Sequence, residues 1–186
     1  MQTAPPTLLR RRHDAADSST DTDARRCVLA VRLENYVGAL NRVANLFSQR
    51  GFNLDSLTVS PTDDPTVSRM TVATSGSPRQ IEQAVAMLGG LVDVLAVEDL
   101  TTAEHVEREL CLVRIRVTPE TRAEIVDYVG LYRGAVVDVQ PDSLVVELTG
   151  PSTKINSFVG HMARYGLDDV ARSGRVAMAR ALTYGA

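Results

Sequence analysis

From Cys27 onward the chain repeats one order of sequence patterns twice, and this repetition limits the fold more than any other feature of its 186 residues. Each half contains alternating apolar runs, which are typical of strands. Each half also contains two stretches with apolar residues at i, i+3, i+4 and i+7, which are typical of helices. Both halves read strand, helix, strand, strand, helix, strand. We therefore predict an α+β fold of two tandem ferredoxin-like βαββαβ domains.

The first predicted domain spans residues 27–100. Its strands are expected at residues 27–33, 54–59, 67–74 and 91–98. Two helical stripes lie between them, formed by Leu40, Val43, Ala44 and Phe47 and by Ile81, Ala84, Val85 and Leu88. Ser77 to Gln80 has the form of a capping box with proline at the first helical position. Gly51 and Gly89-Gly90 fit the ends of the two helices.

A polar stretch at residues 101–109 is predicted to be a linker, and the second domain is expected at residues 110–186. Its strands are predicted from Cys111 to Val117, at 135–139, at 144–148 and, as a short strand, around Val170. The helical stripes are Ile125, Tyr128, Val129 and Tyr132, and then Ile155, Phe158, Val159 and Met162. Thr118-Pro119 and Gly150-Pro151 are expected to open these helices, and Gly134 and Gly166 to close them.

Residues 1–26 differ in composition from the rest of the chain. They contain Arg10-Arg11-Arg12 and a polar stretch rich in Asp, Ser and Thr, so we predict a disordered tail. The tail lacks the apolar core of a secretory signal, and no apolar run approaches the roughly 20 residues that cross a bilayer. We therefore expect a cytoplasmic protein without a membrane partner.

Composition argues against several functional classes. The net charge of −3 and the aromatic content of 4% offer neither a basic surface nor stacking platforms for nucleic acid. Cys27 and Cys111 lie far apart and are interpreted as buried hydrophobes, and the three histidines are scattered. We find no metal-ligating cluster and no paired nucleophile and base. A small enzyme on this scaffold remains an alternative, to be tested by turnover of the isolated chain.

The predicted fold also has a consequence for assembly. Two helices cover only one face of a ferredoxin-like sheet, so the other face or the edge strands need a partner. A monomer of this size would leave much apolar surface in water. We therefore expect a side-by-side or face-to-face dimer, whose interface is a natural place for a ligand.

The turn at residues 34–40 has two interpretations. On spacing alone, an ordinary strand-to-helix turn in which Gly38 relieves strain is favoured, because short glycine motifs are weak signals. The alternative is a site for an amino acid. The backbone N–H groups of Gly38 and Ala39 would take the carboxylate, and the amide of Asn35 would contact both charged groups.

The other candidate residues of the first predicted domain can also be interpreted as structural or as ligand-binding. Asn53 is either a turn residue or a ligand contact. Leu54 has the character of a core residue. Arg69 is interpreted as a solvated strand arginine rather than as an anion contact.

Several stretches taken together resemble one known family. They are Leu33-Glu34-Asn35 with Gly38-Ala39-Leu40, Leu46 to Asn53, Ser56 to Val59, Pro61 to Pro65, Ser68 to Thr71, Leu91 to Val94, Val106 to Glu109 and Val170 to Gly174. Over residues 27–181 the chain is similar to the small regulatory subunits of acetolactate synthase, also called acetohydroxyacid synthase.

The resemblance implies an N-terminal ACT domain, a C-terminal ferredoxin-like domain and a homodimer that joins the ACT domains into one sheet. It implies valine, or another branched-chain amino acid, at their interface. The site would be lined by Asn35, Val37, Gly38, Ala39 and Leu40 of one chain and Asn53 and Leu54 of the other. The pair Tyr36-Val37 is bulkier than the short polar pairs expected there, which would alter effector affinity.

The resemblance further implies that this chain has no chemistry and binds no cofactor of its own. Thiamine diphosphate, Mg²⁺ and FAD would belong to a catalytic large subunit that this chain activates and makes sensitive to valine. An alternative is a free-standing amino-acid sensor that acts on a different protein partner.

Overall fold

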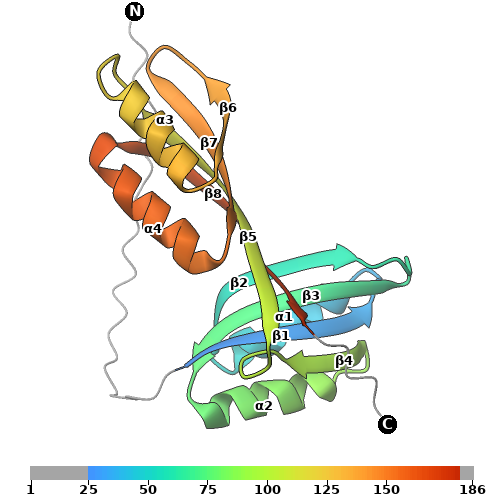
Figure 1. Cartoon of the computed structure of the whole chain (residues 1–186). Helices are drawn as coiled ribbons and strands as arrows, with labels where there is room; N and C mark the ends of the chain where they lie inside the picture. The colour runs from blue at the N-terminus through green and yellow to red at the C-terminus, as the bar shows by residue number, and fades with distance from the viewer. Residues whose placement is uncertain (1–24, 181–186) are drawn as a thin grey trace, which may run out of the picture.

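The computed structural model describes residues 25–180, which form two four-stranded antiparallel sheets, each with two helices (Figure 1). The N-terminal domain comprises β1 (Arg25–Glu34), α1 (Ala39–Gln49), β2 (Asn53–Pro61), β3 (Val67–Gly76), α2 (Pro78–Gly89) and β4 (Val94–Asp99). Its strand order is β2-β3-β1-β4. This arrangement confirms the predicted βαββαβ order.

The C-terminal domain repeats the same order. It comprises β5 (His105–Arg116), α3 (Arg122–Leu131), β6 (Ala135–Val139), β7 (Ser143–Gly150), α4 (Ser152–Met162), the 3₁₀ turn η1 (Ala163–Tyr165) and β8 (Leu167–Ala179). The strand order β6-β7-β5-β8 corresponds to that of the first sheet. The predicted fold class, two tandem ferredoxin-like units, is therefore confirmed.

The core of the N-terminal domain lies between its sheet and the two helices. Val43 and Phe47 of α1, Leu88 of α2 and the inward side chains of β1 and β3 are fully buried there. The predicted capping box of α2 is present, because Gln80 N donates to Ser77 Oγ and Ser77 N donates to Gln80 Oε1. Gly51 follows the end of α1 with φ of 69°, a conformation that favours glycine.

The helices of the C-terminal domain begin and end slightly differently from the prediction. Helix α3 starts at Arg122, after a turn in which Thr118 and Thr121 bond to each other, rather than at Thr118-Pro119. The left-handed residue after α3 is Arg133, with φ of 51°, rather than Gly134. Gly134 has a different role, since a Cβ there would lie 3.0 Å from the carbonyl oxygen of Glu147 on β7.

Two strands are longer than predicted. Residues 105–109, expected to belong to a linker, are the first part of β5, and the short strand expected around Val170 is the 13-residue β8. Charged residues interrupt the apolar alternation in both segments, and in the structure they form ion pairs with each other. Arg172 Nε lies 2.6 Å from Glu109 Oε1, and Arg175 lies 3.5 Å from Glu107. Opposite charges on paired strands thus take the place of an apolar pattern.

Smaller corrections apply at the ends of two other strands. Arg25 and Arg26, assigned to the tail, begin β1, whereas residues 1–24 lie outside the described part of the chain. Strand β4 begins at Val94 instead of Leu91, because Leu91 closes a turn in which its carbonyl accepts from Val94 N.

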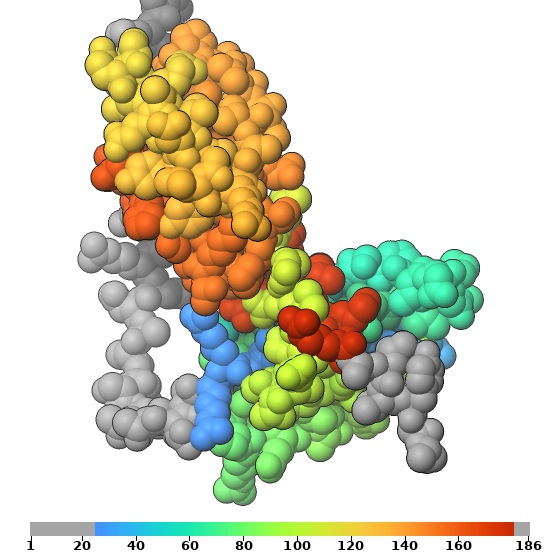
Figure 2. Space-filling model, viewed as in Figure 1, coloured from blue at the N-terminus to red at the C-terminus, as the bar shows by residue number. Residues whose placement is uncertain are grey.

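The ends of β5 and β8 lie against the face of the N-terminal sheet that α1 and α2 leave open (Figure 1). Val28, Ala30, Leu100 and Ala177 form a separate buried cluster there. Figure 2 shows the red end of β8 lying between segments of the N-terminal domain. The chain itself therefore covers part of the face for which we expected a second copy.

Arg69 contributes to this contact, and its interpretation as a solvated strand residue is wrong. Its guanidinium donates to the carbonyl of Ala177 at 2.9 Å, and its Nε is buried without a hydrogen-bond partner among the described residues. Ala177 N in turn donates to Thr71 Oγ1. Strand β8 thus binds the N-terminal sheet through its backbone as well as through its side chains.

Both cysteines are buried and free, as predicted, and burial raises the pKa of the Cys27 and Cys111 thiols. Over residues 25–180, no helix combines the length and the apolar character needed to cross a membrane.

Candidate functional site

The turn between β1 and α1 is tied down from two sides. Asn35 N donates to the carbonyl of Thr66 at 2.7 Å, and Asn35 Nδ2 donates to the carbonyl of Pro65 at 2.8 Å. On the other side, Glu34 N donates to the carbonyl of Asp93. The exposed Asn35 side chain is therefore held in a fixed orientation by the loop between β2 and β3, which is a requirement for a precise polar contact.

A buried carboxylate supports the same turn. Asp93 is only 1% exposed, and it accepts hydrogen bonds from the Tyr36 phenol and from Arg42 Nη1, which lies 3.0 and 2.9 Å from its two oxygens. The hydrogen bond to Asp93 raises the pKa of Tyr36. The unexpectedly bulky Tyr36 is thus a structural anchor of the turn.

Gly38 marks the start of α1 and leaves the helix end open. Its φ of 107° is left-handed, no side chain caps the helix, and a Cβ at this position would meet nothing within 4 Å. Ala39 N donates to the carbonyl of Tyr36 at 3.3 Å. An uncapped first turn carries unsatisfied N–H groups and the positive end of the helix dipole, and both attract an anion.

Apolar side chains flank this open helix end. Val37 is fully exposed and Leu40 is 40% exposed, whereas Ala39 is buried. Aliphatic side chains next to an anion-binding turn suit a ligand that combines a carboxylate with an aliphatic group.

Asn53 and Leu54 lie elsewhere in the chain's fold, at the start of β2. Asn53 Nδ2 donates to Asp55 Oδ1 at 2.6 Å, and Asp55 Oδ2 accepts from Ser75 Oγ at 2.7 Å. Asn53 is exposed, whereas Leu54 is half-buried against the N-terminal core, as its apolar character predicted.

Within one chain the structure does not bring the two halves of the predicted site together. Asn53 pairs with Ser75 at one end of the sheet, and Asn35 adjoins the other end, where Pro61 pairs with Ser68. The 11-residue helix α1, about 16 Å long, separates Gly38 from β2. Strand β2 lies at the edge of the sheet, and Asn53 and the loop that binds Asn35 lie at its two ends.

Hollows in the surface add residues that sequence reasoning missed. A shallow pocket of about 510 Å³ adjoins Asn35 and is lined in part by Tyr36, Thr66 and Leu95. Asp93, which supports the turn, does have a signal in the sequence. It is a charged residue within the apolar run from Leu91 to Leu95, and a carboxylate in such a run is expected to be buried and paired. A larger cavity of about 530 Å³ lies between the two domains, and no sequence pattern indicated it.

Among the described residues, no group of three or more His, Cys, Asp or Glu side chains is arranged to hold a metal ion.

The chain is similar to one family of proteins along most of its length. Residues 29–96 match a family model described as the AHAS small subunit-like ACT domain, and residues 108–181 match one described as the small subunit of acetolactate synthase. The acetolactate synthase isozyme 3 small subunit of Salmonella typhimurium is 46% identical over 156 residues, which are 83% of this chain and 96% of that protein.

Two further relatives extend this similarity. The acetolactate synthase small subunit of Haemophilus influenzae is 44% identical over 156 residues, covering 83% of this chain and 96% of that protein. The crystal structure of the acetolactate synthase small subunit from Thermotoga maritima matches with a TM-score of 0.77 at 33% identity, covering 84% of this chain and 98% of that one.

Proposed function

Because the chain belongs to the family of acetolactate synthase small subunits, we propose that it is a regulatory, non-catalytic subunit of that enzyme. It binds the catalytic large subunit, raises its activity and makes it sensitive to inhibition by valine. The thiamine diphosphate, Mg²⁺ and FAD that the chemistry requires belong to the large subunit. The resulting product serves the biosynthesis of valine, leucine and isoleucine.

The observation that carries this proposal is the open N-terminus of α1. Its N–H groups receive the carboxylate of valine, Asn35 contacts the polar groups, and Val37 and Leu40 adjoin the aliphatic side chain. Gly38 leaves open space where any side chain would stand.

A homodimer completes the site in this proposal. Strand β2 is an edge strand, and antiparallel pairing with β2 of a second copy reverses its direction. Asn53, at the start of β2, then approaches the Asn35 end of the other chain. Valine therefore contacts both copies.

Valine regulates the enzyme only if it binds two arrangements of the dimer with different affinity. A ligand that bridges two chains meets this condition, because its contacts depend on their relative orientation. The activity of the large subunit then depends on that orientation through its contact with the small subunit.

The decisive experiment measures acetolactate formation by the large subunit, without and with this chain, across a valine titration. The chain should raise the activity and confer inhibition. The variant Gly38→Asp should keep the stimulation but need at least about 100-fold more valine, since its carboxylate repels that of the ligand.

Gly38→Asn is the matched control, because asparagine has nearly the same size, carries no charge and tolerates positive φ. It should be inhibited at valine concentrations between those of the wild type and Gly38→Asp. Absence of stimulation would reject the regulatory role and leave the free-standing sensor, whereas unchanged inhibition of Gly38→Asp would reject only the site.

A further inference from the structure

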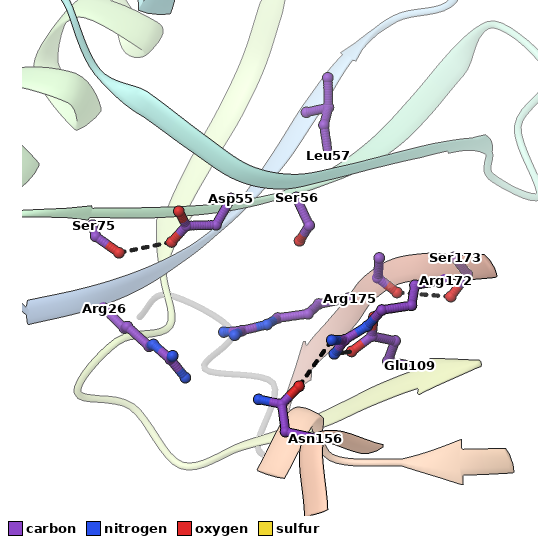
Figure 3. A pocket seen from close by; sticks show the side chains of 11 residues that line it. Arg26, Asp55, Ser56, Leu57, Ser75, Glu109, Asn156, Arg172, Ser173 and Arg175 are labelled. Atoms are coloured by element: carbon purple, nitrogen blue, oxygen red, sulfur yellow. Dashed lines mark hydrogen bonds and ion pairs between the residues drawn. The ribbon is translucent and has the colours of Figure 1, made fainter. Parts of the chain in front are cut away.

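The cavity between the two domains is built mostly from polar and charged side chains. Arg26, Ser56 and Ser75 contribute from the N-terminal sheet, and Asn156 of α4 and Arg175 of β8 contribute from the C-terminal domain. Figure 3 shows these side chains around the space. Its volume of about 530 Å³ lies in the range of small-molecule sites. Leu57 is the only apolar side chain among the described residues that line it, which favours a polar occupant.

The positive charges that line the cavity are unequally compensated. Arg172 is fully engaged, because its guanidinium donates to both oxygens of Glu109 at 2.6 and 2.7 Å and to Asn156 Oδ1 at 2.8 Å. Arg175, only 14% exposed, has a single acceptor, Glu107, at 3.5 Å. The guanidinium of Arg26 makes no hydrogen bond or ion pair with any residue from 25 to 180. Two guanidinium groups therefore keep free donors.

Three arginines and two carboxylates line the cavity, so one positive charge is in excess, and neither carboxylate is bonded to Arg26 or Arg175. Glu109 is bound by Arg172 and Ser152, and Asp55 accepts hydrogen bonds from Asn53 and Ser75. Figure 3 shows the guanidinium groups of Arg26 and Arg175 extending into the same part of the cavity. Arg26 is exposed and Arg175 is largely buried. Like charges that face the same space repel each other, and a bound anion would reduce that cost.

Ser56 supplies an independent observation. Its hydroxyl oxygen is buried and has no hydrogen-bond partner among the described residues, although the side chain belongs to the wall of the cavity. A buried hydroxyl without a partner costs free energy, and such groups mark places where a bound molecule completes the hydrogen bonding.

From these features we infer that the cavity binds a small dianion, a phosphate or a dicarboxylate, anchored by Arg26 and Arg175. Ser56 donates its hydroxyl to the same ligand. The guanidinium fork matches either kind of anion, since both present two coplanar oxygens. Because its anchors come from different domains, the ligand fixes the orientation of one domain against the other.

The test is calorimetric titration of the full chain with inorganic phosphate and, separately, with malonate, at constant ionic strength. At least one probe should bind saturably with a dissociation constant of about 1 mM or less. The probe with the higher affinity shows whether the ligand is a phosphate or a dicarboxylate. If neither saturates by about 10 mM, the inference is overturned.

Two variants and one control locate the binding. Arg26→Gln should weaken it at least about tenfold. Arg79→Gln makes the same charge change at the exposed start of α2, outside the cavity lining, and should leave binding unchanged. Ser56→Ala should weaken binding about threefold and yet leave the free chain as stable or more stable, because it removes an unpaired buried group.

Equal effects of Arg26→Gln and Arg79→Gln would mean that only net charge matters, and they would overturn the site. The titration contains neither valine nor large subunit. Its failure would therefore leave the proposed regulatory function untouched.

Discussion

In the N-terminal domain the turn before α1 contains Gly38, and no side chain caps the helix. In the C-terminal domain the corresponding turn is closed by its own residues. Thr118 and Thr121 each accept a hydrogen bond from the other's backbone N–H, and Glu124 places a carboxylate in the first turn of α3. Neither helix has a side-chain cap, so the difference lies in the turn: two threonine hydroxyls brace it in the C-terminal domain, and Gly38 stands there in the N-terminal domain.

The two domains also bury a carboxylate differently. Asp93 in the N-terminal domain is bound by Arg42, whose side chain is 56% exposed, and by Tyr36. Glu109 in the C-terminal domain is bound through both oxygens by Arg172, whose side chain is 36% exposed. The ion pair that lies at the junction of the domains is the better shielded one, so removal of one of its partners should cost more stability.

Glu109→Gln should therefore have the largest effect on folding. It leaves Arg172 without its anionic partner and should lower the free energy of unfolding by about 3 kcal/mol. The matched change in the N-terminal domain, Asp93→Asn, should cost less, because solvent already compensates the exposed Arg42. Urea unfolding of both variants measures the difference, and a larger loss for Asp93→Asn would reverse the comparison.

The contribution of Glu109 should depend on pH. Hydrogen bonds from Arg172 hold the pKa of Glu109 below its usual value. Folding therefore favours the ionised carboxylate, and the stabilisation is complete above about pH 4.3 and is lost as the pH falls through the folded-state pKa. The difference in unfolding free energy between the wild type and Glu109→Gln should stay constant from about pH 7 to 5 and shrink below about pH 4. A difference that grew on acidification would refute this linkage.

Asn53→Ala tests the second half of the open site. Loss of a hydrogen bond to a charged ligand should weaken valine binding about tenfold, without dissociating the dimer. Calorimetry gives the affinity and sedimentation the oligomeric state. Asn45→Ala, an exposed asparagine within α1, is the control and should bind valine normally. Unchanged affinity of Asn53→Ala would remove this residue from the site.

Thr121→Ala should have the smallest effect. It opens the turn before α3 by removing one hydroxyl, and should cost about 1 kcal/mol of stability or less. Valine inhibition of the holoenzyme should not change, because the C-terminal turn is not part of the effector site. Altered inhibition would show that the closed turn also takes part in regulation.

The parts of the fold that follow hydrophobic periodicity were predictable from the sequence. The stripe from Leu40 to Phe47 and the capping box at Ser77 produced helices close to their observed limits. The failures lie where two polar segments stabilise each other. Considered alone, neither segment indicates a strand, because one contains Glu107 and Glu109 and the other contains Arg172 and Arg175. The two segments form regular strands because these charges pair across β5 and β8.

The candidate site was predictable only in part for a similar reason. Gly38 and Asn35 stand out locally, because a turn before a helix has its own residue preferences. The support from Asp93, and the cavity that joins Arg26 to Arg175, depend on residues more than 50 positions apart in the sequence. Contacts over such separations leave no local pattern.

The ribbon formed by β5 and β8 runs from the C-terminal sheet onto the N-terminal one. A two-stranded ribbon resists stretching, because the backbone of both strands is already close to its maximum length. Its twist is softer and varies widely between proteins. The connection between the domains is therefore stiff along its length and softer in torsion. Pulling the domains apart costs much free energy, whereas rotating one domain about the long axis of the ribbon costs comparatively little.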